Sequence, residues 1–496
     1  MGSMRYLLSA VLCCAVLALP GPADGFDLSQ LPKLGDAGTT GLSREDERRI
    51  GRTMVSQLRE SGALIEDPEI EHYVRTVGQR LVAHSDRPEE QFEFFVVNDT
   101  SINAFAMPGG YVGVNLGLIL ATDTEAELAG VMAHEVAHVT QRHIARRIED
   151  SQGSNLAALG GMLAAVLVGV QTGQADVTAA GAMSAQALAL RRQLQFSRAH
   201  EHEADRIGIR MMARAGYDPQ GMVDFFETLD RRYRHSGGDS VPEYLQTHPL
   251  TSTRITEARS RAREMSFDAR TPSRNYYLTR TRLNARTTNP EIRELISLVP
   301  SRMPENAALT DQLDRYGRAL RHYYQGRSNE AVDILKELVD ESPDMVAYHR
   351  ALADALRASG EEDQSREHLA RALRLFPDNV ALLESYGSAL LAAGQPQDAY
   401  EVYGRILDSN DAKPRHLRHR ARAANDAGNI ADSHFYLARY HFEQRNLPLA
   451  MSQIRLAQTH PAAQFGRMDR YNRLAEDIWS AWERTPDRER QAQRRR

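Results

Sequence analysis

The stretch His134-Glu135-Val136-Ala137-His138 places two histidines four residues apart, with a glutamate directly after the first. Residues four apart share one face of an α-helix, so the two imidazoles can bind one metal ion. A catalytic zinc site has three protein ligands and keeps an open position for water. In this pattern the glutamate is the usual general base. The stretch therefore predicts a helix with two zinc ligands, His134 and His138, and a catalytic base, Glu135.

Apolar residues recur at helical spacing on both sides of this box and predict one long helix from Ala121 to Arg147. No proline interrupts the run, and Thr124 with Glu127 has the pattern of a capping box at its start. His143 lies five residues beyond His138 and off the ligand face, so we expect it to support the site or the structure. The alternative is an amphipathic helix whose histidines face solvent.

A second acidic box, Glu201-His202-Glu203-Ala204-Asp205, offers a third ligand. Glu201 can bind the zinc ion while Asp205, on the same helical face, accepts a hydrogen bond from the outer nitrogen of a ligand histidine. Glu203 is the competing ligand, but it lies about 200° from Glu201 around the helix. Ordinary solvated acids are the alternative. A site of one zinc ion per chain requires the Glu201 side chain within about 5 Å of both imidazoles.

The segment Thr247-His248-Pro249-Leu250-Thr251-Ser252-Thr253-Arg254 contains two further candidates. Pro249 disfavours helical geometry at the preceding residue and therefore places His248 on a loop. His248 and Arg254 are candidate donors for the anionic tetrahedral intermediate of peptide hydrolysis. His248 could instead occupy the fourth zinc position and hold the enzyme latent, or it could be a surface histidine.

Two runs rich in aromatic and β-branched residues predict strands at 92–97 and 111–115, the second after a Pro-Gly-Gly turn. An exposed strand edge beside the metal would bind an extended peptide by main-chain pairing. We expect the second strand to provide that edge and Asn103 to help position it. The predicted substrate-binding residues are Asn103, Tyr111, Val112, Gly113, Val114 and Asn115.

The C-terminal part has a clear repeat, because Gly326, Gly360, Gly394 and Gly428 recur every 34 residues. A period of 34 residues with small residues at fixed places is the tetratricopeptide pattern. Small side chains let the two helices of a repeat approach closely, and glycine fits the turn between them. The repeats predict an all-α solenoid.

The N-terminus and the overall charge indicate the compartment. A basic residue followed by an apolar run, prolines and small residues predicts a cleavable signal peptide, with a retained membrane anchor as the alternative. The only cysteines, Cys13 and Cys14, lie inside it, so the processed chain would suit an oxidising compartment such as the periplasm of a Gram-negative bacterium. A net charge of −5 with interspersed acids and bases gives no support to nucleic-acid binding.

At 496 residues the chain is too long for one ordinary core. We expect an α+β, mostly helical metallopeptidase domain with a small sheet, followed by the repeat solenoid. Two apolar stretches at 156–190 are each too short to span a bilayer, and they form either core helices or a hairpin that covers the site or touches a membrane. The predicted order is a signal peptide (1–25), the metallopeptidase domain (26–266), a linker (267–304), the tetratricopeptide-repeat domain (305–483) and a basic disordered tail (484–496).

The motifs resemble the HExxH metallopeptidase family that contains HtpX and the CAAX prenyl proteases. The resemblance implies zinc ligands His134, His138 and Glu201, a catalytic Glu135 and a regulatory His248. Membrane-bound relatives carry transmembrane helices between the two boxes; the shorter segments here suggest peripheral membrane contact through 156–190. The matching residues are Asn103-Ala104-Phe105-Ala106, Pro108-Gly109-Gly110, the box at 134–138, Ser197-Arg198, and Glu201 with Ala204-Asp205.

The resemblance further implies quality control of outer-membrane proteins, with the repeats docking unfolded or misassembled clients or the barrel-assembly machinery. We therefore predict a periplasmic zinc metalloendopeptidase with chaperone activity in the assembly of outer-membrane β-barrel proteins. The alternative is a repeat-based chaperone or scaffold whose metal site is mostly latent.

Overall fold

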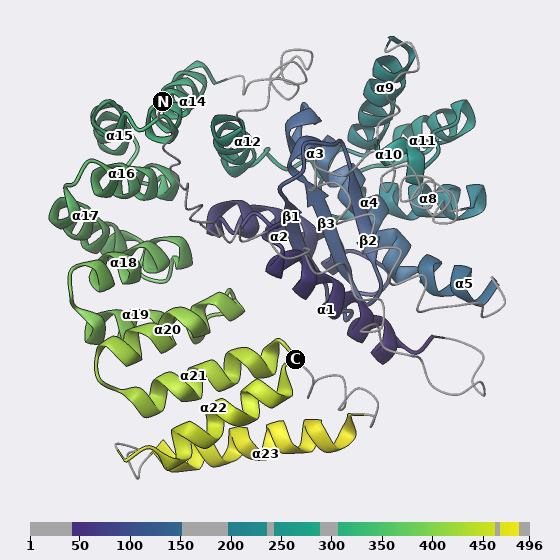
Figure 1. Cartoon of the computed structure of the whole chain (residues 1–496). Coiled ribbons are helices and arrows are strands. Elements are labelled where there is room, and N and C mark those ends of the chain that lie inside the picture. Colours follow the sequence, from purple (N-terminus) through teal and green to yellow (C-terminus); the bar gives the residue numbers. More distant parts are fainter. Residues whose placement is uncertain (1–41, 151–196, 236–242, 288–305, 462–466, 486–496) are drawn as a thin grey trace, which may run out of the picture.

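The computed structural model describes residues 42–150, 197–235, 243–287, 306–461 and 467–485 (Figure 1). The predicted signal peptide, the apolar segment 156–190 and nearly all of the basic tail lie outside these residues. The described chain is mostly helical with one three-stranded sheet, which confirms the predicted fold class. None of its helices combines the length and the apolar character that crossing a membrane requires.

The N-terminal part contains the sheet and the helices around it, and the two predicted strands are both present, as β1 and β3. Asp67 begins α2 as its N-cap and accepts hydrogen bonds from the backbone N–H groups of Glu69 and Ile70, which would otherwise lack partners. The elements are α1 (Arg44–Glu60), α2 (Pro68–Ala83), β1 (Glu93–Val97), β2 (Ala104–Met107), β3 (Tyr111–Asn115), α3 (Leu116–Ala121), α4 (Glu125–Thr140), α5 (His143–Asp150), α8 (Arg198–Arg214), α9 (Gln220–His235), α10 (Glu243–Thr247), α11 (Ser252–Glu264) and α12 (Arg274–Arg286).

The sheet has the order β1-β3-β2, in which β3 is parallel to β1 and antiparallel to β2. Because β3 pairs on both sides, the expectation that Tyr111–Asn115 offers an exposed edge is wrong. The sequence signal missed β2, a four-residue strand without strong β-branched character. The outer side of β1 is covered near its end by a bridge between Leu64 and Val97. The free edge of the described sheet next to α4 is therefore β2, which packs against that helix.

The HExxH box lies in α4, and this helix is shorter than the sequence predicts. Thr124 is its N-cap and accepts from the backbone N–H of Glu127, as the capping pattern indicates. However, α4 ends at Thr140 because Arg142 adopts a left-handed backbone conformation with φ of 54°. A new helix, α5, starts at His143. The prediction of one continuous helix from 121 to 147 is thus wrong at both ends, because Ala121 still belongs to α3 and α4 begins only at Glu125.

The C-terminal part is an arc of antiparallel helices that curls past α2 and α1 (Figure 1). The four periodic glycines separate the helices of successive pairs and all have positive φ, between 71° and 87°, which confirms their role in the turns. Gly387 is small for another reason, since a Cβ atom there would lie 2.7 Å from the ring of Tyr403. The helices are α14 (Ala307–Tyr324), α15 (Ser328–Glu341), α16 (Val346–Ala358), α17 (Glu362–Leu375), α18 (Val380–Ala392), α19 (Pro396–Leu407), α20 (Pro414–Asp426), α21 (Ile430–Glu443), α22 (Leu447–Thr459) and α23 (Met468–Arg484).

The range expected to be a linker, 267–304, contains α12, which packs on α2 and α3 on one side and on α14 on the other. Its apolar residues Tyr276 and Leu283 join the core of the N-terminal part, while Leu278 and Ala285 join the first repeat core. The helix therefore connects the two parts through a shared hydrophobic contact.

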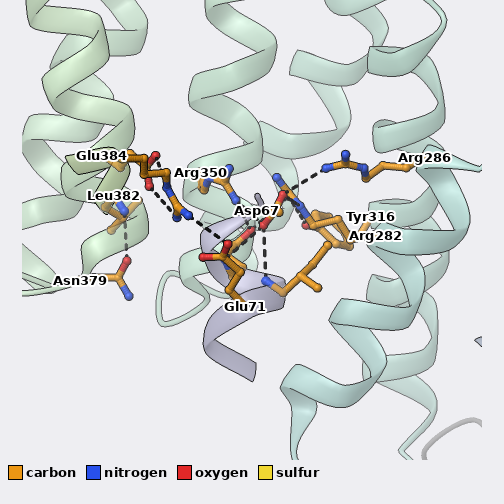
Figure 2. Close-up of polar contacts among 12 residues, drawn as sticks. Asp67, Glu71, Arg282, Arg286, Tyr316, Arg350, Asn379, Leu382 and Glu384 are labelled. Atoms are coloured by element: carbon orange, nitrogen blue, oxygen red, sulfur yellow. Dashed lines mark hydrogen bonds and ion pairs between the residues drawn. The ribbon is translucent and has the colours of Figure 1, made fainter. Parts of the chain in front are cut away.

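An ionic cluster at the start of α2 joins the same parts (Figure 2). The buried Asp67 carboxylate lies 2.8 Å from Nε of Arg282 in α12 and 2.9 Å from a terminal nitrogen of Arg350 in α16. One turn further along α2, Glu71 lies 2.9 Å from Arg415 of α20. Arg282 and Arg350 hold the pKa of Asp67 well below its usual range, although burial acts in the opposite direction. We call these side chains, together with Glu384, the α2 joint.

Glu384 makes the α2 joint sensitive to acid. Burial would raise its pKa, but a hydrogen bond with His416 and the charge of Arg415 outweigh burial and lower the pKa to about 2. An acid whose pKa is lowered on folding stabilises the fold above its unfolded value of 4.5, and this contribution is lost as the pH falls towards 2. Burial raises the pKa of Glu71 above 4.5 instead. The effect of Glu71 on stability therefore changes with pH above 4.5 and not between pH 4.5 and 2.

We therefore expect the free energy of unfolding of the wild-type chain to fall more between pH 4.5 and 2 than that of Glu384→Gln, by on the order of 2 to 3 kcal/mol. Urea unfolding curves measured across this pH range check the difference. The matched control is Glu401→Gln, which alters an exposed carboxyl group in the neighbouring helix α19. Parallel pH curves for wild type and Glu384→Gln would contradict the assignment.

Candidate active site

Four buried side chains converge between α4, α8 and the loop after α10: His134, His138, Glu201 and His248. Nε2 of His134 and Nε2 of His138 are 3.0 Å apart, and each lies 3.4 Å from a carboxylate oxygen of Glu201. Nδ1 of His248 lies 3.2 Å from Nε2 of His134 and 3.1 Å from Glu201. Glu201 thus meets the requirement of lying within about 5 Å of both imidazoles.

These spacings fit a tetrahedral metal ion. Nitrogen and oxygen ligands lie about 2.0 to 2.2 Å from zinc, so ligand atoms at the corners of a tetrahedron are about 3.3 Å apart. The donor atoms here are separated by 3.0 to 3.4 Å. The three residues expected as ligands, together with His248, therefore form a donor set of suitable chemistry and size.

The charge balance of the site also favours a bound metal ion. Glu135, Glu201 and Asp205 are buried beside one buried cation, Arg254. Isolated charges are costly to bury, and a divalent ion would compensate the two excess negative charges. Burial opposes protonation of His134, but Glu201 and Asp205 outweigh burial and raise its pKa to about 9. The site therefore has a strong affinity for positive charge.

Glu135 lies beside the donor cluster and has the environment of a general base. Burial raises its pKa, and the neighbouring His248 and His134 partly offset that effect. Its Oε1 is 3.4 Å from Nε2 of His248, and the backbone N–H of Ala106 in β2 also acts to lower its pKa. A carboxyl group beside a metal site can accept a proton from a water molecule there.

Asp205 lies behind His134, as the sequence predicts. Its Oδ1 is 2.9 Å from Nδ1 of His134, and two nitrogens of Arg254 bind the Asp205 carboxylate at 2.7 and 2.8 Å. A third nitrogen of Arg254 lies 2.7 Å from Glu201. The guanidinium thus binds two carboxylates, and its expected role as a donor to the reaction intermediate stays a prediction. In the structure it braces the ligand and its neighbour.

His248 is buried rather than on the surface, and several contacts place it. Its backbone N–H donates to the carbonyl of Tyr244 in α10, and its ring stacks on the Tyr244 ring at 4.8 Å. The Tyr244 N–H in turn donates to the carbonyl of Ile102, just before β2. Tyr244 was missed because no motif marks α10 in the sequence. Sheet, helix and loop together hold His248 over the donor cluster.

His143 lies directly behind His138, with their Nδ1 atoms 2.9 Å apart. Its other nitrogen, Nε2, is 3.0 Å from Oε2 of Glu203. The break after α4 brings this histidine back to the site. Glu203 itself does not reach the donor cluster, in line with its position around α8.

The residues expected to bind substrate have mixed positions. Asn103 is buried just before β2, and its carbonyl accepts from the backbone N–H of Asn115. The side-chain amide of Asn115 donates to Ser101, whose hydroxyl donates to Glu243 of α10. These residues therefore support the sheet and α10, and the strand next to α4 with an open edge is β2 rather than β3.

The fold and the site define a metallopeptidase: an HExxH helix, a glutamate ligand candidate on a second helix and a tetratricopeptide array. The model of peptidase family M48 matches residues 68–262, and a tetratricopeptide-repeat model matches residues 316–380. The chain belongs to the M48 peptidases and, by its full-length relatives, to the family of β-barrel assembly-enhancing proteases. It is a metalloendopeptidase.

The β-barrel assembly-enhancing protease of Escherichia coli is 32% identical over 482 residues, which cover 95% of this chain and 97% of the relative. A putative protease of the same name from Vibrio cholerae is 33% identical over 80% of this chain and 81% of its own. A mitochondrial metalloendopeptidase of Arabidopsis thaliana is 31% identical over 44% of this chain and 41% of its own. The first similarity spans both the peptidase part and the repeats.

The bracing role of Arg254 predicts a large effect on stability. Arg254→Ala leaves two buried carboxylates without their cation, and breaking a buried pair in this way costs about 3 to 5 kcal/mol. The measurement is urea unfolding of the metal-free protein. Arg259→Ala is the control, because Arg259 pairs with Glu227 at a partly exposed position. An Arg254→Ala protein with unchanged stability and a lower kcat would instead support the role of intermediate donor.

Proposed function

We propose that this chain is a zinc-dependent endopeptidase of the periplasm that acts in the assembly and quality control of outer-membrane β-barrel proteins. The observation that carries the proposal is the buried set of three donors, His134, His138 and Glu201, with Glu135 beside it. Zinc suits two imidazoles and one carboxylate, the ligand set of several zinc peptidases. Relatives named for β-barrel assembly, similar over nearly the whole chain, support the substrate class and the compartment.

A zinc ion held there would lower the pKa of a coordinated water towards about 7 and polarise the peptide carbonyl. Glu135 accepts the proton of the attacking water and passes it to the leaving amine. Asp205 keeps the tautomer and orientation of the His134 imidazole through its 2.9 Å contact with Nδ1. Arg254 keeps Asp205 and Glu201 in place while this happens.

We propose the open edge of β2, residues 104–107, as the place where an extended substrate segment pairs with the sheet. β2 packs against α4, so a peptide on this edge runs past Glu135. Pairing through backbone groups accepts many sequences, as unfolded clients require. The arc of repeats offers a second surface, which we propose docks these clients or the barrel-assembly machinery.

The position of His248 favours a second function, in which the peptidase is held latent while the repeats act as a chaperone or scaffold. With Nδ1 of His248 at 3.1 to 3.2 Å from Glu201 and His134, the ring takes the fourth corner of the donor set. A ring at that corner excludes the water that hydrolysis needs. Proteolysis then depends on withdrawal of the loop that carries His248.

The central test replaces Glu135 by glutamine, which removes the base but none of the three proposed ligands. We expect Glu135→Gln to hold about one zinc ion per chain and to lose casein cleavage by at least about a hundredfold. Metal content measured by mass spectrometry and a casein assay check both expectations. A cleaving Glu135→Gln enzyme, or a wild-type chain without zinc, would refute the proposed chemistry.

The latency proposal predicts that a substitution of His248 increases casein cleavage, whereas the substitution of Glu135 abolishes it. His248→Ala opens the fourth corner of the donor set, so we expect casein cleavage to increase several-fold while about one zinc ion per chain is retained. His202→Ala is a suitable control, because His202 is a partly exposed histidine that pairs with Glu257 away from the cluster. Equal or slower cleavage by His248→Ala would rule out latency through this ring.

A further inference from the structure

The second acidic box contains a carboxylate without a role in the chemistry described above, Glu203. We infer that Glu203, acting through His143, orients the imidazole of His138 in the way that Asp205 orients the imidazole of His134. Both are positioning residues rather than ligands. This inference rests on the proposed metal site, and it assigns all three acids of the box to that site.

The direction of the hydrogen bonds follows from the proposed ligand atoms. If Nε2 of His138 faces the metal, its proton is on Nδ1, which can only donate. The atom 2.9 Å away is Nδ1 of His143, which must then be an acceptor and carry its proton on Nε2. That Nε2 lies 3.0 Å from Oε2 of Glu203. One carboxylate thus fixes the tautomers of two imidazoles in series.

Surrounding contacts hold the relay in place. Arg146 of α5 lies 2.8 Å from the same oxygen of Glu203 and keeps that carboxylate charged and oriented. The His143 side chain is fully buried, and its ring meets the His138 ring edge-on at 4.8 Å. His200 stacks on a face of the His143 ring, with the ring centres 4.4 Å apart. The intermediate imidazole is therefore held by a stacked ring on one face and by a hydrogen bond at its edge.

The local fold explains why a relay is needed on this side. Asp205 shares the helical face of Glu201 and reaches His134 directly. Glu203 is about 200° away from Glu201 around α8, so it cannot reach an imidazole of α4 itself. The helix break at Arg142 returns His143 to fill the gap. Of the three acids in the box, Glu201 is thus the ligand. Asp205 supports His134 directly, and Glu203 supports His138 through His143.

The test measures the dissociation constant of Zn²⁺ for the full-length chain by competition with a chelator at fixed pH. Glu203→Ala should bind Zn²⁺ about tenfold more weakly than wild type, the lower end of the usual range for such partners, because the Glu203 side chain is 29% exposed. Glu203→Gln keeps a neutral acceptor and should recover part of the loss. Glu257→Ala removes the partner of His202, which is not a proposed ligand, and should match wild type.

Double variants separate the relay from a general loss of structure. Adding Glu203→Ala to His143→Ala should cause no further weakening, because both changes break one chain of contacts. Adding it to Asp205→Asn should multiply the two losses, because those carboxylates support different histidines. The Co²⁺ absorption spectrum of Glu203→Ala should also shift relative to wild type. Unchanged Zn²⁺ affinity in Glu203→Ala overturns the relay alone, whereas a wild-type chain that binds no Zn²⁺ overturns the proposed function beneath it.

Discussion

Three carboxyl groups buried beside a single guanidinium form the constraint on which the catalytic half depends. Glu135, Glu201 and Asp205 are each less than 5% exposed, and Arg254 balances only one charge. Such a cluster is stable only with further cations, which here are protonated imidazole or a divalent ion. The excess negative charge and the affinity for a metal are therefore one property of the core. Stability of the fold and readiness for catalysis cannot be separated at this site.

The end of α4 shows how the backbone serves that cluster. Arg142 adopts a conformation that non-glycine residues rarely take, and its side chain binds Glu47 and the carbonyl of Leu42 in the N-terminal segment. These contacts offset the cost of the local conformation. Because the chain turns at Arg142, His143 lies beside the ligand histidines instead of further away along the same helix.

The sequence was informative wherever a residue pattern directly encodes geometry. Two histidines four apart on a helix, an acid pair at the same spacing and glycines at a 34-residue period all imply positions that the structure confirms. The errors concern features set by tertiary contacts. A strand as short as β2 has no periodicity to detect, and the positive φ of Arg142 depends on partners about a hundred residues away. The roles of Arg254 and Tyr244 likewise depend on neighbours that spacing cannot reveal.

The helix α2 links the two halves of the molecule. Its N-terminal acids bind arginines of α12, α16 and α20, while its apolar face packs against α4, the helix of the HExxH box. The N-terminal end of a helix also favours negative charge, so Asp67 serves as cap, ion-pair partner and anchor at once. Because these charges are largely buried, the repeats cannot tilt away from α2 without separating Asp67 from Arg350 and Glu71 from Arg415. The contacts of Arg350 and Arg415 with the acids of α2 thus hold the arc of repeats beside the peptidase part through that helix.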